Sequence, residues 1–320
     1  MLGSLALVTG ATGAVGPALV AELLRQGQRV RVLSRQRPAD GLFPAAVEVV
    51  IGDITDRDTV QAAVASVNQV YHLAALLHIT NPSPELRAEY QRVNVDATRL
   101  VAEAAARAHV QRLIYFSTVK VYGAQSREPI TEEHSLNPQT DYAQTKLDGE
   151  RAAQQHIDTS VLRLSPIYGA RLRGSWRFLV KGISSGLFLP VGSLQNVRSL
   201  TYVDDAARAA LLVAQQPSST KVNLVAHEAV PMHAILDAIY AACSKQRPRL
   251  HLPAALVEVG AGLAEFAFSV IGKRSPLTRD GIAQLTQSET YSGAKLRALG
   301  FQAEMSLDEG WRRAVAELEG

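Results

Sequence analysis

Residues 5–16 read Leu5-Ala-Leu-Val-Thr-Gly10-Ala-Thr-Gly13-Ala-Val-Gly16, an apolar run followed by three glycines at three-residue spacing. The run predicts a strand, and residues 15–26 have the apolar spacing of a helix. In such a loop the first glycine permits a tight turn, the second lets backbone approach a ligand, and the third allows close helix packing. Because a helix N-terminus attracts anions, the residues predicted to hold the pyrophosphate of a dinucleotide are Gly10, Thr12, Gly13, Ala14, Val15 and Gly16.

Outward from this loop, short β-branched runs alternate with helical patterns through the first half of the chain. Predicted strands cover 5–9, 29–34, 47–51, 69–74 and 112–117, and predicted helices cover 15–26, 59–67 and 94–107. This alternation predicts an α/β fold of the Rossmann type, a doubly wound parallel sheet with helices on both faces. The rhythm loosens after about residue 170, although residues 221–226 read as a further short strand. We therefore expect an NAD(P)-binding domain over 1–170 and, over 171–320, a smaller α/β region that caps the substrate, some of whose segments return to the sheet.

Composition excludes several function classes. The 320 residues are 47% hydrophobic and carry a net charge of only +3, with no basic run interleaved with aromatic residues, so nucleic acid binding is not expected. The single cysteine, Cys243, favours a reducing compartment, and a cytoplasmic protein without a signal peptide is expected. Residues 253–272 are apolar, but because Glu258 and Glu265 lie among them, a packed and mostly buried helix is predicted rather than a membrane span. The eight histidines show no metal-ligand spacing.

The end of the second predicted strand bears on the choice of cofactor. NAD-binding folds place an acid there for the ribose hydroxyls, whereas a nearby arginine accommodates the extra phosphate of NADP. This strand ends in Ser34 and Arg35, with no acid at the decisive position. NADP(H) is therefore favoured over NAD(H). The alternative is that Arg35, like Arg37 close by, is only a solvated surface residue.

Two further strand ends face the predicted cofactor. Asp53 and Ile54 follow the third strand, where the carboxylate of Asp53 could accept a hydrogen bond from the adenine amino group; it could equally cap the helix that begins near Asp56. The fourth strand ends in His72 and three small or apolar residues, which would let the cofactor lie against backbone. Those three are Leu73, Ala74 and Ala75.

A tyrosine and a lysine supply candidate redox chemistry. Tyr142 and Lys146 are four residues apart and so share one helix face. A phenol is a poor base at neutral pH, but a neighbouring cation favours its ionised form and makes proton exchange with a substrate hydroxyl feasible. Thr118 ends the fifth strand, at the carboxyl edge where parallel sheets bind ligands. It is predicted to orient the reacting oxygen.

Almost the whole chain resembles the extended short-chain dehydrogenase/reductase family. The resemblance rests on motifs that follow one another in this order: the glycine loop, Asp53, residues 72–75, Asn94, Ser117 with Thr118, and Tyr142 with Lys146. The resemblance implies that Thr118, Tyr142 and Lys146 are the catalytic trio and that Asn94 supports the cofactor. It also rests on the sixth-strand motif Arg163-x-x-x-x-Tyr168-Gly169. Within that motif, Ser165 and Pro166 are expected beside the cofactor.

Three segments resemble the nucleotide-sugar branch of the family: residues 120–123, 187–192 and, above all, 198–205. By that resemblance Arg198 grips a diphosphate, as a planar donor fork suits phosphate oxygens; the alternative is a rim ion pair with Asp204 or Asp205. Thr118, Lys120 and Arg198 are the expected substrate contacts. Two departures narrow the branch: dehydratases carry an Asp-Glu pair where this chain has Val119 and Lys120, and typical epimerases carry asparagine at Pro166.

The sequence thus predicts hydride transfer at a ring carbinol or ketone, with C4 of a nucleotide-linked sugar favoured, by a 4-keto reductase or a 4-epimerase. The run Ser275–Arg279 also resembles 3β-hydroxysteroid dehydrogenases and dihydroflavonol reductases, so a non-nucleotide ring alcohol is the second hypothesis. A non-catalytic dinucleotide-binding protein is a third. Relatives often dimerise through the helices that follow Asn94 and carry Tyr142, so a homodimer is a further expectation.

Overall fold

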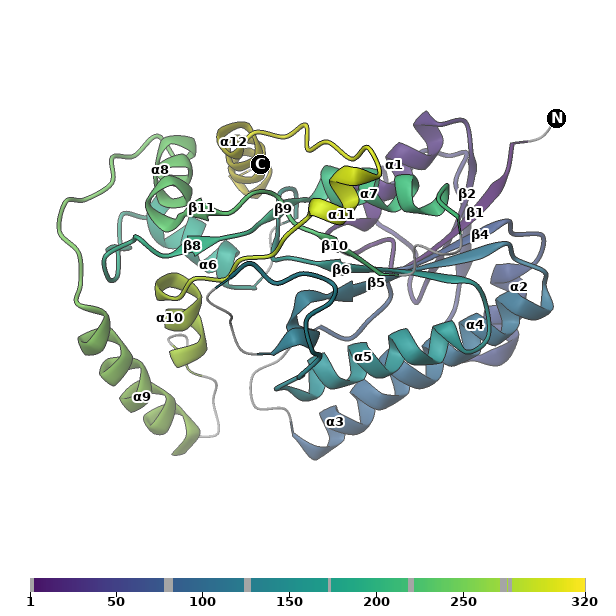
Figure 1. The fold of residues 1–320 in the computed structure, drawn as a ribbon, viewed down its shortest axis with the longest axis horizontal. Helices are drawn as coiled ribbons and strands as arrows, with labels where there is room; N and C mark the ends of the chain where they lie inside the picture. Colours follow the sequence, from purple (N-terminus) through teal and green to yellow (C-terminus); the bar gives the residue numbers. More distant parts are fainter. Residues whose placement is uncertain are drawn as a thin grey trace.

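Seven parallel strands form the central sheet of the computed structural model, which describes residues 3–77, 83–123, 128–171, 174–217, 222–270, 275 and 278–319 (Figure 1). The strand order is β10-β6-β5-β4-β1-β2-β3. The chain winds one way from β1 and then the other from β4, so the switch lies between β1 and β4, where open α/β sheets bind ligands. The strands are β1 (Leu5–Thr9), β2 (Arg29–Ser34), β3 (Glu48–Ile51), β4 (Gln69–His72), β5 (Arg112–Thr118), β6 (Thr159–Leu164) and β10 (Val222–Val225).

Helices cover both faces of this sheet. Successive side chains of a strand point to opposite faces, and the strands carry apolar residues on both. Ala6 and Val8 of β1 pack in the cluster with α1 (Gly16–Arg25) and α7 (Val203–Ala214). Leu5 and Leu7 of the same strand pack in the other cluster. On that face lie α2 (Arg57–Val64), α4 (Ala97–Arg107) and α5 (Asp141–Gln154). The predicted doubly wound Rossmann-type sheet is confirmed.

Two segments differ from their predicted bounds for physical reasons. The helix predicted from residue 94 starts as a π-helical turn over Gln91–Asp96 before α4 begins. Such turns relax the regular spacing locally, which here turns the buried Asn94 inward. The strand predicted over 221–226 is β10, which ends at Val225 and pairs with β6 at the edge of the main sheet; residue 221 lies outside the described residues. The division of the chain at residue 170 stays a prediction.

Smaller elements surround the carboxyl ends of the sheet. Trp311, fully buried, stacks on Tyr168 at 4.8 Å between ring centroids and touches Trp176 at 5.3 Å, so three distant segments share one aromatic cluster. These elements are α3 (Pro84–Tyr90), η2 (Val119–Tyr122), β7 (Ile167–Tyr168), α6 (Gly174–Ser184), β8 (Val197–Arg198), β9 (Thr201–Tyr202), β11 (Val230–Pro231), α8 (Met232–Ala242), α9 (Ala254–Val270), α10 (Arg279–Thr286), α11 (Ala294–Ala298) and α12 (Leu307–Glu319).

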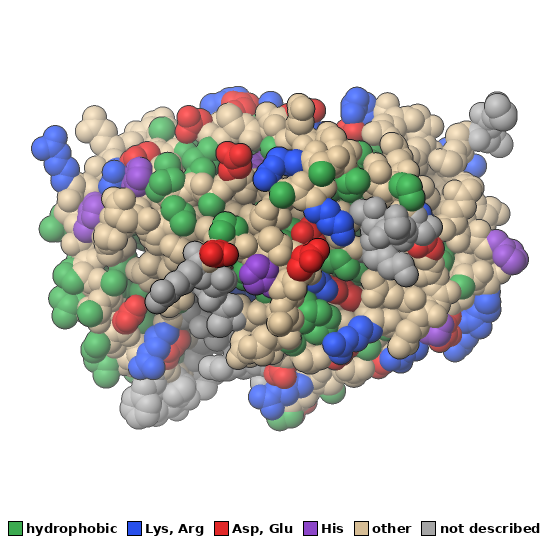
Figure 2. Space-filling model, viewed as in Figure 1, with side chains coloured by type: hydrophobic (Ala, Val, Ile, Leu, Met, Phe, Trp, Pro, Cys, Tyr) green, Lys and Arg blue, Asp and Glu red, His purple; other side chains and the backbone are tan. Residues whose placement is uncertain are grey.

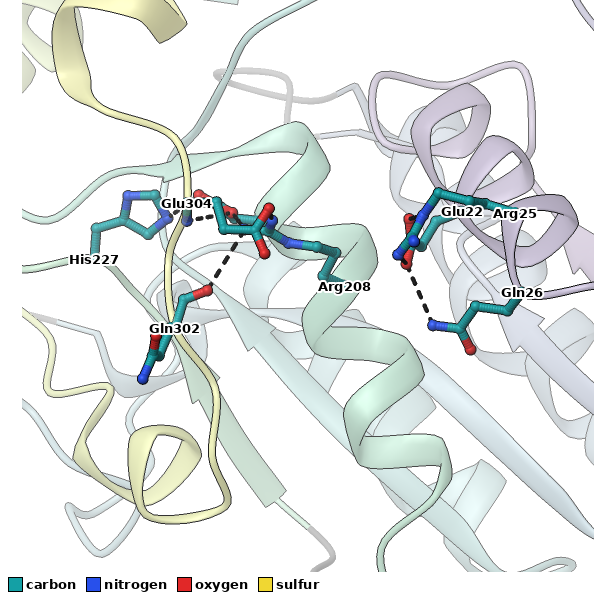
Figure 3. Close-up of polar contacts among 8 residues, drawn as sticks. Glu22, Arg25, Gln26, Arg208, His227, Gln302 and Glu304 are labelled. Atoms are coloured by element: carbon teal, nitrogen blue, oxygen red, sulfur yellow. Dashed lines mark hydrogen bonds and ion pairs between the residues drawn. The ribbon is translucent and has the colours of Figure 1, made fainter.

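The C-terminal segment returns to the main sheet through one charged group of contacts (Figure 3). Arg208 of α7 pairs with the buried Asp205 and with Glu304, and the Glu304 backbone N–H donates to Asp205 at 3.2 Å. His227 lies 2.8 Å from the other oxygen of Asp205. These contacts fix the segment before α12 against α7.

Helix α9 does not match its prediction. Instead of being mostly buried, it exposes Leu256, Val259 and Leu263 by 70%, 62% and 67%. Apart from Glu258 and Glu265 the helix carries few polar residues, and sequence periodicity cannot distinguish such a helix in a core from one at the end of the molecule. In Figure 1 α9 lies at one end of the long axis, with α10 beside it. No helix among the described residues is long and apolar enough to cross a membrane.

Candidate active site

One cleft of about 600 Å³ opens at the carboxyl ends of the strands, beside the switch between β1 and β4. It is lined by the ends of β1, β2, β4 and β5, by the start of α5, and by segments from the second half of the chain. Most of the predicted site residues line it: Gly10, Thr12, Gly13, Ala14, Val15, Ser34, Arg35, Asp53, Ile54, Leu73, Ala74, Ala75, Thr118, Lys120, Tyr142, Lys146, Ser165, Pro166 and Arg198.

The glycine loop has the geometry of a dinucleotide cradle. Gly10 has a φ of +69°, and a Cβ there would lie 2.5 Å from the backbone nitrogen of Ala74, so a side chain is excluded. Val15, at the N-cap of α1, makes no side-chain capping hydrogen bond, which leaves the first turn open to an anion. Gly16 does not line the cleft: its Cβ would lie 2.0 Å from the carbonyl oxygen of Ala11, so it serves packing alone. The loop therefore fits a pyrophosphate.

The ribose end of the cleft combines two cations, Arg35 and Arg92, with two carboxylates, Asp53 and Glu89. Asp53 accepts hydrogen bonds from the backbone N–H and the hydroxyl of Thr55, at 2.8 and 2.7 Å, and these bonds lower the pKa of Asp53. It does not cap α2, because Asp56 does. Arg92 donates to the Thr55 hydroxyl at 3.1 Å and lines the cleft with Arg35. Sequence reasoning missed Arg92, which carries no motif.

Asn94, which is predicted to support the cofactor, lies behind the cleft and is not among the residues that line it. Its side-chain oxygen accepts from the backbone N–H of Leu76 at 2.7 Å, and its amide donates to the Leu76 carbonyl and to Thr145. The amide is thus occupied in joining the loop after β4 to α5. Because Leu76 itself lines the cleft, Asn94 shapes the wall from behind.

The three expected catalytic side chains meet in the cleft. Thr118 ends β5, and its hydroxyl is hydrogen-bonded to Tyr142, which lies in the first turn of α5. Lys146, one turn further, is 2% exposed, and its Nζ lies 4.1 Å from the centre of the Tyr115 ring. A cation over an aromatic face is stabilised electrostatically. Helix α5 reaches this position because Gly149 lets it approach the π-helical turn; a Cβ there would lie 2.5 Å from the Asn94 carbonyl oxygen.

Burial dominates the ionisation of the pair. It raises the pKa of Tyr142 to about 12, against a smaller lowering by the hydrogen bond from Thr118. It lowers the pKa of Lys146 to about 7, with Glu150 acting in the opposite direction. The expected lowering of the Tyr142 pKa by Lys146 is absent, since burial outweighs the ammonium, which lies against the Tyr115 ring.

A sealed ion pair supports this helix from behind. Glu150, 2% exposed, accepts from Arg163 Nε at 3.1 Å and Nη2 at 2.7 Å, and also from the Ser117 hydroxyl. Arg163 also donates to the Tyr122 hydroxyl at 2.8 Å. Neither charged side chain lines the cleft. The network ties α5 to β5, β6 and η2, and so fixes the position of the catalytic helix.

The substrate end of the cleft is built from distant segments. Arg198, 2% exposed, pairs with Glu289 and donates to the Gln287 carbonyl at 3.3 Å. Glu289 lines the cleft as well. Arg198 thus forms an ion pair with an acid, as the alternative interpretation expected, but the acid is Glu289 and the arginine is buried rather than at the rim. Sequence reasoning missed this carboxylate, which lies 91 residues away and carries no local signal.

Comparisons with known proteins agree with this site. A model of the NAD dependent epimerase/dehydratase family matches residues 6–225. The N-acetyl-alpha-D-glucosaminyl-diphospho-ditrans,octacis-undecaprenol 4-epimerase of Escherichia coli O157:H7 is 26% identical over 318 residues, covering 97% of this chain and 93% of its own. The 3 beta-hydroxysteroid dehydrogenase/Delta 5-->4-isomerase of Mycobacterium tuberculosis is 36% identical over 196 residues, which are 56% of this chain and 51% of that one.

Among solved structures, UDP-glucuronic acid 4-epimerase from Bacillus cereus in complex with NAD has the same fold. Its TM-score is 0.77 at 20% identity, over 98% of both chains. The glycine cradle, the cleft at the switch between β1 and β4, and the family match over more than half of the residues support one assignment. The chain belongs to the NAD dependent epimerase/dehydratase family and is an NAD(P)-dependent enzyme of the extended short-chain dehydrogenase/reductase type.

Proposed function

We propose that the protein transfers hydride between NADP(H) and a ring carbinol or ketone, at C4 of a nucleotide-linked sugar, as a 4-keto reductase or 4-epimerase. The observation that carries this proposal is the convergence of Thr118, Tyr142 and Lys146 in the cleft that also holds the glycine cradle. Arg198, at the other end of the same cleft, supplies the donor fork for a diphosphate.

In this proposal each side chain has one task. Tyr142 exchanges the proton of the substrate hydroxyl, and Thr118, hydrogen-bonded to Tyr142, holds the reacting oxygen. Lys146 provides the positive charge that favours the phenolate when the site is filled. The bound nicotinamide supplies or accepts the hydride. Burial of Lys146 keeps water away from its ammonium group.

The preference for NADP(H) rests on the charge of the ribose end. Ser34 and Arg35 line the cleft where an NAD-binding fold would place an acid. Arg92 adds a second cation there, although its ion pair with Glu89 offsets part of that charge. A cofactor that leaves after each turnover would make the enzyme a reductase, whereas tightly held NAD would make it an epimerase.

A second candidate is a dehydrogenase or reductase of a non-nucleotide ring alcohol such as a steroid. Arg198 already has a carboxylate partner in Glu289, so a diphosphate would have to displace or share it. The substrate end is also walled by Trp176, Val119 and Ile167. The relative named as a 3 beta-hydroxysteroid dehydrogenase supports this candidate over part of the chain.

The first experiment identifies the cofactor. Freshly purified protein is denatured, any released dinucleotide is identified by mass spectrometry, and NADH and NADPH are titrated into the cofactor-free form. Tighter binding of NADPH is expected, and Arg35→Ser should remove that preference while its neighbour Arg37→Ser, which does not line the cleft, should not. Retained NAD without preference for NADPH would contradict the assignment and favour an epimerase.

The second experiment tests the chemistry. Tyr142→Phe should lower kcat by about a thousandfold with UDP-sugars or ring-alcohol substrates, because the proton then has no donor or acceptor. Dinucleotide binding and the thermal midpoint should change little. Activity equal to that of the unchanged protein would overturn the assigned role of Tyr142.

A further inference from the structure

Helix α9 has two apolar faces, and only one of them is covered. Val257 and Ala261, one turn apart, pack with Val191 and with Ile282 of α10. Leu256, Val259 and Leu263 form a stripe along the opposite side. That stripe is exposed by 62% or more at each position.

Two segments that adjoin α9 carry further exposed apolar side chains. Val191 forms a parallel bridge with Leu252, so Leu189 and Leu250 occupy adjacent register positions just before it. Leu250 is 64% and Leu187 is 85% exposed. Seven exposed residues are together called the apolar tip: Leu187, Leu189, Leu250, Leu252, Leu256, Val259 and Leu263. They are seven of the twelve exposed large apolar side chains found among the described residues. Figure 2 shows hydrophobic side chains gathered at the end of the molecule where α9 lies.

Three cations and two carboxylates flank the apolar tip in the described part of the chain, which leaves an excess of one positive charge. Lys245 and Arg249 are exposed on the segment that leads into α9, and Arg279 is exposed at the start of α10. The two carboxylates on α9 are Glu258 and Glu265, and Glu265 lies 3.9 Å from Arg279. An apolar stripe bordered by cations is the combination that favours an anionic lipid surface.

We propose that the apolar tip docks this protein on the surface of an anionic lipid bilayer. The stripe of α9 enters the boundary between headgroups and acyl chains, with the helix axis in the plane of the surface. Lys245, Arg249 and Arg279 lie at headgroup level and pair with lipid phosphates. This contact is peripheral and needs no membrane-crossing helix.

The tip is joined to the substrate end of the cleft through α10. Helix α10 packs on α9, and the segment directly after α10 supplies Gln287 and Glu289, which contact Arg198. A docked enzyme would therefore present its cleft close to the bilayer, where a ring substrate carried on a lipid is accessible. This consequence rests on the proposed function, whereas the docking does not.

Vesicle binding tests the proposal without reference to activity. Full-length protein is sedimented with vesicles of equal parts phosphatidylglycerol and phosphatidylcholine, and with phosphatidylcholine alone. Binding is expected to the anionic vesicles and should weaken as salt is raised. Leu256→Gln and Leu263→Gln should each lower the partition constant about tenfold, and Lys245→Gln or Arg249→Gln about fivefold.

The matched control carries Val49→Thr and Leu136→Gln, which remove exposed apolar side chains elsewhere on the molecule. This control should bind vesicles like the unchanged protein. A second readout, Leu256→Trp, should show blue-shifted emission on adding anionic vesicles, and Val49→Trp should not. No binding to anionic vesicles, or equal loss in the control, would overturn the proposal. So would a dimer, detected by light scattering, that the Leu256 and Leu263 changes convert to a monomer, since the tip would then bind a second copy.

Discussion

Two arginine–glutamate pairs lie near the cleft, and they differ in what surrounds them. Glu150 and Arg163 belong to α5 and β6 and do not line the cleft, and Ser117 and Tyr122 make further hydrogen bonds with the pair. Arg198 and Glu289, although similarly buried, both line the cleft. The first pair is closed on all sides, whereas the second can be approached by a ligand.

This difference shows how one chemical pairing serves two purposes. A closed pair holds its elements in place, and its charge acts on neighbours, as Glu150 does on Lys146. A pair that lines a cleft can exchange one partner for an anionic substrate, because the arginine fork fits a phosphate as well as a carboxylate. Substitutions in the Glu150–Arg163 pair should therefore change the stability of the protein, and substitutions in the Arg198–Glu289 pair should change its affinity for substrate.

The largest effect is expected from breaking the closed pair. Glu150→Ala leaves the Arg163 guanidinium buried without its carboxylate, and this should lower the free energy of unfolding by about 3–5 kcal/mol. Urea unfolding measures it. Glu103→Ala, which breaks the exposed pair with Arg107, is the control and should cost less than about 1 kcal/mol. Equal losses in the two variants would show that the closed pair has no special structural role.

A smaller effect, on affinity, is expected at the pair that lines the cleft. Arg198→Ala should raise KM for a nucleotide-sugar substrate at least about tenfold with little change in kcat, because the lost bonds are made equally in the ground and transition states. Steady-state kinetics measures both constants. Glu289→Gln, which removes the competing carboxylate, should leave KM equal or lower. Unchanged KM in Arg198→Ala would favour the ring-alcohol candidate.

The smallest expected effect is on the pH dependence of stability. It arises at Lys146, whose pKa is influenced by Glu150 of the closed pair. The pKa of Lys146 is about 7 in the folded protein, whereas an ordinary lysine, as in the unfolded chain, has a pKa of 10.5. Between these two pH values the unfolded chain therefore binds one more proton than the folded protein. Stability of the cofactor-free protein should therefore rise with pH above about 7, by about 1 kcal/mol per unit. Lys146→Met should abolish this rise. A rise that persists in the variant would assign it to another group.

The site could be predicted only where its geometry is local. Gly10 and Gly13 adjoin one strand and one helix, and Tyr142 and Lys146 share one helix turn, so local spacing and their order along the chain predicted that they would meet in one cleft, which they line. The contacts of Asn94 with Leu76 and Thr145 could not be predicted, because no spacing rule reveals the π-helical turn on which Asn94 lies.

The amino-acid sequence by itself determined the alternation of strands and helices, the glycine loop and the family, because these depend on periodicity and on residues close together in the chain. Only the tertiary structure decided that Arg198 meets Glu289, since that contact joins segments 91 residues apart. It also decided that α9 is exposed on one side. Burial depends on which elements cover a helix, and a helix with few polar residues carries no sign of where its neighbours end.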